Sequence, residues 1–135
     1  MVGCKSDSDR IGAELDRIGA EMDRLYAVYL HGDYTKAKRS LEDALIVLGD
    51  LEKINPKGGA HGYWLAYCRL AMIEARNGNS ALAEIDLAKA NYWQIRKLEK
   101  LHESPDSIAN CIKSFDMQKC MELVDKFDAH NGGRK

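Results

Sequence analysis

This sequence of 135 residues predicts an all-α protein, and three observations lead to that fold class. The chain has only two prolines, and β-branched residues are sparse beside the helix formers Ala, Leu, Glu, Lys and Arg. Apolar residues recur at intervals of three and four, as they do on one face of a helix. Two stretches also share one pattern of a turn followed by small residues. The length suits a single domain with one core.

The shared pattern predicts two helical hairpins. Each copy reads as a tight turn that opens a helix, and its small residues would let a neighbouring helix approach closely. The copies are Gly32-Asp33-Tyr34 followed by Ala37, Leu41 and Ala44, and Gly78-Asn79-Ser80 followed by Ala83, Leu87 and Ala90.

A first helix is predicted over about residues 8–30, because apolar residues recur there at heptad spacing. We expect this stripe to pack inside its own bundle, although a short heptad pattern is also compatible with dimerisation through the helix. Both a monomer and a homodimer therefore stay open. The stripe consists of Ile11, Leu15, Ile18, Met22, Leu25 and Tyr29.

The next two predicted helices differ in their apolar pattern. Residues 34–54 form an amphipathic outer helix, which Pro56 and the glycines after it end. Residues 60–77 are apolar on nearly every side. A helix of that kind belongs at the centre of a bundle.

A fourth helix is predicted over about residues 80–102, capped by Asn79 or Ser80. A fifth opens at Ser104-Pro105-Asp106, bends or breaks near Ser114–Asp116, and ends before Asn131. The expected buried face of the fourth helix is Leu82, Ile85, Ala88, Tyr92, Ile95 and Leu98. The domain organisation that follows is a flexible polar tether at residues 1–9, one helical-repeat domain at 10–129, and a disordered tail at 130–135.

On these residues the chain resembles tetratricopeptide-repeat proteins over about residues 20–95. Both second helices match, and the first helix of the second hairpin has Tyr67, Leu70 and Ala71 where the family has an aromatic, a Leu and a small residue. Glu74 stands at a later tyrosine position, and the two turns lie 46 residues apart, whereas family repeats are about 34 residues long. The resemblance implies two stacked antiparallel hairpins and a C-terminal capping helix with a bend. An unrelated up-and-down bundle is the alternative.

The resemblance also implies a function, because the first helices of such repeats line a groove that binds a protein or peptide. In this chain the groove would comprise Leu65, Cys68, Arg69, Met72 and Arg76, joined from the first hairpin by Asp23 and Tyr26. Arg69, Met72 and Arg76 suit a peptide with acidic and apolar features. We therefore expect a non-enzymatic binding module.

A concentration of aromatic residues on the third and fourth predicted helices suggests an alternative. Most of these side chains are expected to pack in or near the core. They would otherwise line a pocket for a small ligand. The residues are His61, Tyr63, Trp64, Tyr67, Tyr92 and Trp93.

Charge and motif content argue against several other functions. Twenty basic and 21 acidic side chains nearly cancel and are interspersed, so no field would attract nucleic acid. The four histidines are scattered, no cysteine pair has close metal-ligand spacing, and no phosphate-binding glycine loop is present. We expect no catalytic residue, no metal site and no cofactor.

The N-terminus resembles the end of a bacterial lipoprotein signal. Met1-Val2-Gly3-Cys4 has apolar and small residues before a cysteine, and a polar stretch follows. The resemblance implies that Cys4 carries lipid and that the protein is anchored at the bacterial cell envelope. A chance match of four residues, with a cytoplasmic location, is the alternative.

The other cysteines admit two interpretations. Cys111 and Cys120 would lie about 13 Å apart on opposite faces of one continuous helix, too far for a disulfide. Cys68 could meet either of them across helices in an oxidising compartment. We expect buried free thiols, and a disulfide of Cys68 would instead support export.

Overall fold

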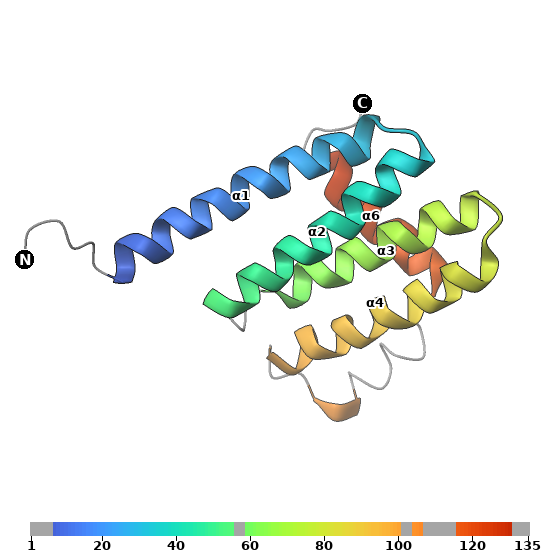
Figure 1. Cartoon of the computed structure of the whole chain (residues 1–135). Coiled ribbons are helices and arrows are strands. Elements are labelled where there is room, and N and C mark those ends of the chain that lie inside the picture. Colours follow the sequence, from blue (N-terminus) through green and yellow to red (C-terminus); the bar gives the residue numbers. More distant parts are fainter. Residues whose placement is uncertain (1–6, 56–58, 101–103, 107–115, 131–135) are drawn as a thin grey trace, which may run out of the picture.

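The computed structural model describes residues 7–55, 59–100, 104–106 and 116–130 of the chain. Within them it has long helices and no strand, so the prediction of an all-α protein is confirmed. The helices are α1 (Asp7–His31), α2 (Tyr34–Ile54), α3 (Ala60–Arg76), α4 (Ser80–Lys100) and α6 (Met117–His130) (Figure 1).

The predicted helix positions agree with the structure to within a few residues. α1 begins at Asp7, so the end of the proposed tether at residues 1–9 is helical. Acidic side chains stabilise the positive end of a helix, and Asp9 lies in the first turn. Of the predicted fifth helix before the bend, the opening at Ser104-Pro105-Asp106 is described and has Pro105 and Asp106 helical, and residues 107–115 lie outside the described residues. So do the extension of the fourth helix to residue 102 and most of the predicted tail.

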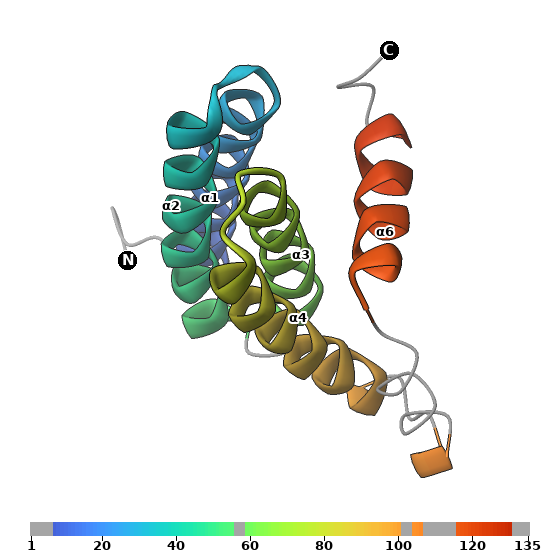
Figure 2. The same ribbon diagram turned by 90° about the vertical axis from the view of Figure 1, so that its right-hand side faces the viewer.

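The helices are arranged around α3. The chain reverses after α1, so that α2 runs back along it, and α4 likewise runs back along α3 (Figure 1). α2 also contacts α3, and α6 packs on α3 on the side away from α2 (Figure 2). The prediction that the most apolar helix lies at the centre is confirmed, because α3 is in contact with α2, α4 and α6.

The small residues of the shared pattern are buried between the helices. Ala37 and Ala44 of α2 are almost inaccessible, as are Ala83 and Ala90 of α4. An alanine takes little room, so helix axes can come close where it faces a neighbour. This part of the sequence interpretation agrees with the structure.

The predicted buried face of α4 was wrong at four of its six residues, whereas Ile95 is half-buried and the side chain of Leu98 lies outside the described part of the chain. Leu82, Ile85 and Tyr92 are 44%, 51% and 54% exposed, and Ala88 is exposed as well. The face that packs on α3 is instead the stripe of small residues around Ala83 and Ala90. Close approach of two helix backbones needs small side chains at the contact, and this requirement outweighs the larger apolar area of the other stripe.

The apolar stripe of α1 is buried only in part. Ile18, Leu25 and Tyr29 pack against α2 and α3, as expected. Ile11 and Leu15 are 44% and 40% exposed, because the first turns of α1 extend beyond the end of α2 (Figure 1). The expectation that the whole stripe packs inside the bundle therefore fails for its first two residues.

The two glycine turns are built differently. A Cβ on Gly32 would lie 2.7 Å from the Val28 carbonyl oxygen, so close backbone approach requires glycine there. Asp33 then caps α2, its carboxylate accepting a hydrogen bond from the Lys36 amide at 2.9 Å. Gly78 instead has a positive φ of 81° and ends α3 in a Schellman motif, in which the Asn79 amide donates to the Glu74 carbonyl.

α6 has a defined start at the predicted break. The Asp116 carboxylate accepts a hydrogen bond from the Lys119 amide at 3.0 Å, which satisfies one free donor of the first turn. The Cys120 amide donates to the Asp116 carbonyl at 3.1 Å and begins the helical ladder. A new helix therefore begins at Met117.

Candidate functional site

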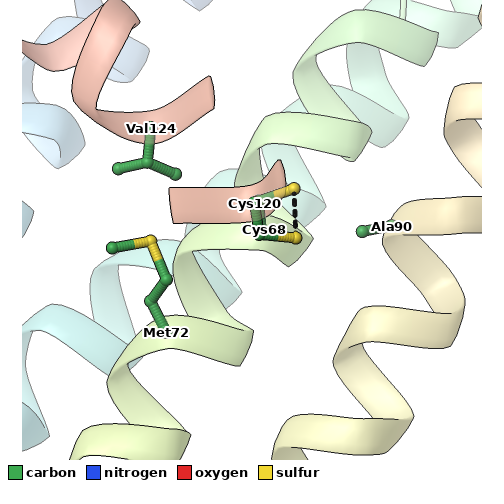
Figure 3. Packing of buried hydrophobic residues seen from close by; sticks show 5 residues of the cluster. All are labelled: Cys68, Met72, Ala90, Cys120 and Val124. Atoms are coloured by element: carbon green, nitrogen blue, oxygen red, sulfur yellow. Dashed lines mark hydrogen bonds between the residues drawn. The ribbon is translucent and has the colours of Figure 1, made fainter. Parts of the chain in front are cut away.

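α6 lies on the side of α3 that contributes most of the predicted groove residues. Cys120 and Val124 of α6 pack against Cys68 and Met72 of α3 and Ala90 of α4 (Figure 3). Cys68 is completely buried and Met72 is 2% exposed. These two predicted groove residues are therefore covered by the chain's own C-terminal helix.

Asp128, near the end of α6, is completely buried and is held by side chains of two other helices. Its Oδ1 accepts hydrogen bonds from Arg69 Nη2 at 2.6 Å and from the Tyr26 hydroxyl at 3.0 Å. The Tyr29 hydroxyl donates to Oδ2 at 3.4 Å. A buried carboxylate needs such partners, because an unpaired charge is costly away from water.

The Arg69 guanidinium also lies over two aromatic rings. Its central carbon is 4.7 Å from the centre of the Tyr26 ring and 5.1 Å from that of Tyr29. Cation–π contacts of this kind stabilise a partly desolvated arginine. Among the described residues the Arg69 Nε–H has no hydrogen-bond acceptor, although the atom is buried.

An open cavity of about 420 Å³ lies beside this ion pair. Four of the seven predicted groove residues line it, from both α1 and α3, and Tyr26 and Arg69 belong to the Asp128 site as well. Its walls combine apolar and charged side chains, as a peptide-binding pocket requires. The lining residues are Met22, Asp23, Tyr26, Leu65 and Arg69.

Arg76, the seventh predicted groove residue, lies apart from the others. It is exposed near the end of α3 and lines a second cavity of about 310 Å³ with Tyr29, Tyr34 and Ile73. In the structure the other cavity is lined by Asp23, Tyr26, Leu65 and Arg69 together with Met22, so Arg76 does not share a cavity with them.

A second buried carboxylate, Glu74 of α3, was not singled out from the sequence as a site. It is 1% exposed and accepts hydrogen bonds from the Tyr34 hydroxyl, from Lys38 Nζ at 3.2 Å and from Asn79 Nδ2 at 3.5 Å. Burial is the largest single influence on the pKa of Glu74 and raises it, but the three donors together outweigh burial and lower the pKa. The sequence feature that could have identified this site is the presence of an acidic residue within the most apolar predicted helix.

The aromatic side chains of α3 and α4 pack on one another. Tyr63 stacks on Trp93 with ring centres 4.3 Å apart, and Tyr92 meets the Trp93 ring edge-on at 5.2 Å. Lys97 lies over the Trp64 ring at 4.5 Å. These contacts occupy ring faces that a small ligand would use.

His61 meets Trp64 edge-on at 5.6 Å and shares its surroundings. Burial first, and then the positive charges of Lys97 and Arg69, lower the pKa of His61. The neutral form of this imidazole is therefore favoured near neutral pH. Tyr67, the remaining member of the predicted cluster, is half-buried, and Lys89 lies over its ring at 5.5 Å.

Within the described parts of the chain, no group of three or more His, Cys, Asp or Glu side chains is arranged to hold a metal ion. None of the helices described has the length and apolar character needed to cross a membrane. Cys4 and Cys111 lie outside the described residues.

The chain was compared with models of known families, with curated proteins and with solved structures, and no match was found.

Proposed function

We propose that this chain is a non-enzymatic helical module, similar to tetratricopeptide repeats, that binds a protein or peptide segment on the face formed by α1 and α3. The single observation that carries the proposal is the open cavity between these helices. It combines apolar walls at Met22 and Leu65 with a carboxylate at Asp23 and a guanidinium at Arg69. Such a mixture suits a segment with both apolar and charged side chains.

The contacts of α6 indicate which chemistry this face accepts. Val124 and Asp128 are one helical turn apart, so an apolar side chain and a carboxylate reach α3 from the same side of α6. A partner in the neighbouring cavity would likewise meet an apolar side chain and the Arg69 guanidinium on α3. We therefore propose an amphipathic segment whose acceptor group meets Arg69 while its apolar side chains contact Leu65.

The proposal is tested by selecting displayed peptides of about 14 residues against the full chain and measuring their affinity for it. Replacing Leu65 by alanine removes part of the apolar wall, and we expect selected peptides to bind at least about tenfold more weakly. The matched control is Leu82→Ala, which makes the same chemical change at an exposed site on α4 outside this cavity. Circular dichroism and the melting temperature verify that both variants are folded.

Equal affinity for the wild type and Leu65→Ala would remove this cavity from consideration. Failure to select any peptide whose binding depends on Leu65 would count against the function itself. Loss of binding in the Leu82→Ala control would place the binding surface on the exposed side of α4.

Lipid anchoring at Cys4 is a separate part of the proposal. The resemblance of Met1-Val2-Gly3-Cys4 to a lipoprotein signal supports attachment at the bacterial cell envelope. When the natural gene is expressed with a labelled fatty acid, the label should appear on the protein and disappear in Cys4→Ala. Unlabelled protein in the cytoplasmic fraction would favour the alternative location.

A small-ligand site at the aromatic cluster is the weaker alternative, because its rings already stack on one another. Tryptophan fluorescence during a metabolite screen tests it. A saturable change that is lost in Trp64→Phe or Trp93→Phe would favour a ligand site there.

A further inference from the structure

Two cysteines from distant parts of the chain meet in the core below α6. Cys68 Sγ of α3 and Cys120 Sγ of α6 are 2.9 Å apart, and both side chains are completely inaccessible to solvent (Figure 3). They are 52 residues apart in the sequence and are not joined by a disulfide. The sequence allowed two partners for Cys68; Cys120 lies beside it in the structure, and Cys111 lies outside the described residues.

The surroundings of the pair leave few other roles for it. The buried side chains packed with the pair are Met72, Ala90 and Val124, which are apolar, and the nearby charge that acts on Cys68 is that of Arg69. No group of metal-ligating side chains occurs among the residues described. A covalent S–S bond is about 2.05 Å long, so the two sulfurs need to approach by only about 0.9 Å to form one.

We propose that Cys68 and Cys120 form a redox site, in which a low-molecular-weight disulfide oxidises the two thiols to a disulfide that joins α6 to α3. This role does not depend on the protein having a binding partner. It would fix the C-terminal helix over the face that contains Cys68 and Met72.

The reaction is thiol–disulfide exchange in two steps. One cysteine thiolate attacks a sulfur of the small disulfide RSSR, forms a mixed disulfide and releases RS⁻. The second thiolate then attacks the protein sulfur of that mixed disulfide, forms the Cys68–Cys120 bond and releases the second RS⁻. The protein loses two electrons and two protons, and the small disulfide becomes two thiols.

Access and thiolate formation both depend on α6. The hydrogen bond between the Cys68 and Cys120 thiols, followed by burial, raises the pKa of Cys68. Little Cys68 thiolate therefore exists while α6 is packed on α3. Oxidation should therefore proceed when α6 separates from α3, either during folding or in brief openings of the folded protein. Reseating α6 then brings the two sulfurs together for the second step.

The test incubates the full chain in glutathione buffers of increasing oxidised fraction, alkylates the free thiols and digests the protein with trypsin. Cleavage after Lys and Arg places Cys68 in peptide 58–69, Cys111 in 101–113 and Cys120 in 120–126. The proposal expects peptide 58–69 to be linked to 120–126. A dominant link from 58–69 to 101–113, or thiols that stay free under oxidising conditions, would overturn it.

Thermal unfolding provides a second readout. Closing a loop of this length should raise the melting temperature of the oxidised wild type by roughly 10 °C over the reduced form. Cys120→Ala should abolish that shift, whereas the matched control Cys111→Ala should keep it. A shift that persists in Cys120→Ala would contradict the assignment, and peptide mapping of the wild type decides the linkage even if that variant does not fold.

Discussion

Asp128 and Glu74 are two carboxylates with almost the same burial, yet they join different parts of the molecule. Asp128, on α6, is bound by groups from α1 and α3, and its cationic partner Arg69 is 11% exposed. Glu74, on α3, is bound by groups from α2 and the turn before α4, and its partner Lys38 is 31% exposed. Water therefore screens the second ion pair more than the first. Equal burial of two carboxylates therefore does not imply that their ion pairs contribute equally to stability.

Removing the cation at Asp128 should have the largest effect. Arg69→Met leaves Asp128 without its charged partner, and we expect the free energy of unfolding to fall by about 3–5 kcal/mol, measured by urea denaturation. The double variant Arg69→Met with Asp128→Leu removes both charges and should recover most of the loss. A loss below about 1 kcal/mol in the single variant would show that Asp128 is not buried in solution.

Removing the cation at Glu74 is the matched experiment. Lys38→Met should lower the free energy of unfolding by about 1–3 kcal/mol, because Lys38 is partly hydrated and Tyr34 and Asn79 still donate to Glu74. Urea denaturation measures this value under the same conditions as for Arg69→Met. An equal loss in both variants would contradict the difference in screening between the two sites.

The lowered pKa of Glu74 predicts an acid-dependent part of the stability. A carboxyl whose pKa is lower in the folded state binds protons more readily when unfolded, so it contributes stability above its ordinary pKa of 4.5. That contribution should decline as pH falls below about 4.5 toward the lowered value. Urea denaturation from pH 7 to pH 3 should show a steeper fall for the wild type than for Glu74→Gln. If the stability of the wild type and of Glu74→Gln fell in parallel with pH, the hydrogen-bond donors would not favour the charged form of Glu74.

The smallest effects are expected from the tyrosine hydroxyls. Tyr26→Phe removes one hydrogen bond to Asp128, and Tyr34→Phe removes one to Glu74. Each should lower the free energy of unfolding by about 1–2 kcal/mol. Tyr34→Phe removes one of the donors that lower the pKa of Glu74, so it should also weaken the acid dependence assigned to Glu74. An unchanged acid dependence in Tyr34→Phe would mean that this hydroxyl does not favour the charged form of Glu74.

The helices could be predicted because the residues that define each helix lie within it or next to it in the sequence. Apolar spacing, the turn residues and the capping Asp33 lie within a few positions of the elements that they define. The buried face of α4 was not predictable from apolar area, since Leu82 and Ile85 form as regular a stripe as Ala83 and Ala90. Which stripe is buried depends on how closely α3 approaches.

The Asp128 site was not predictable, because its partners are far away in the sequence. Tyr26, Tyr29 and Arg69 lie 102, 99 and 59 residues from it. Nothing local distinguishes Asp128 from the exposed acidic residues of α6. The resemblance to tetratricopeptide repeats assigned Tyr26 and Arg69 to a predicted groove, but it gave no sign that both would bond to Asp128.

The convergence of three side chains on Asp128 has a mechanical consequence. Tyr26 and Tyr29 lie on α1 and Arg69 lies on α3, so the Asp128 carboxylate is bonded to both helices. Separating α1 from α3 would therefore break bonds to this carboxylate. Through a single side chain, the C-terminal helix links two helices that are not consecutive in the sequence.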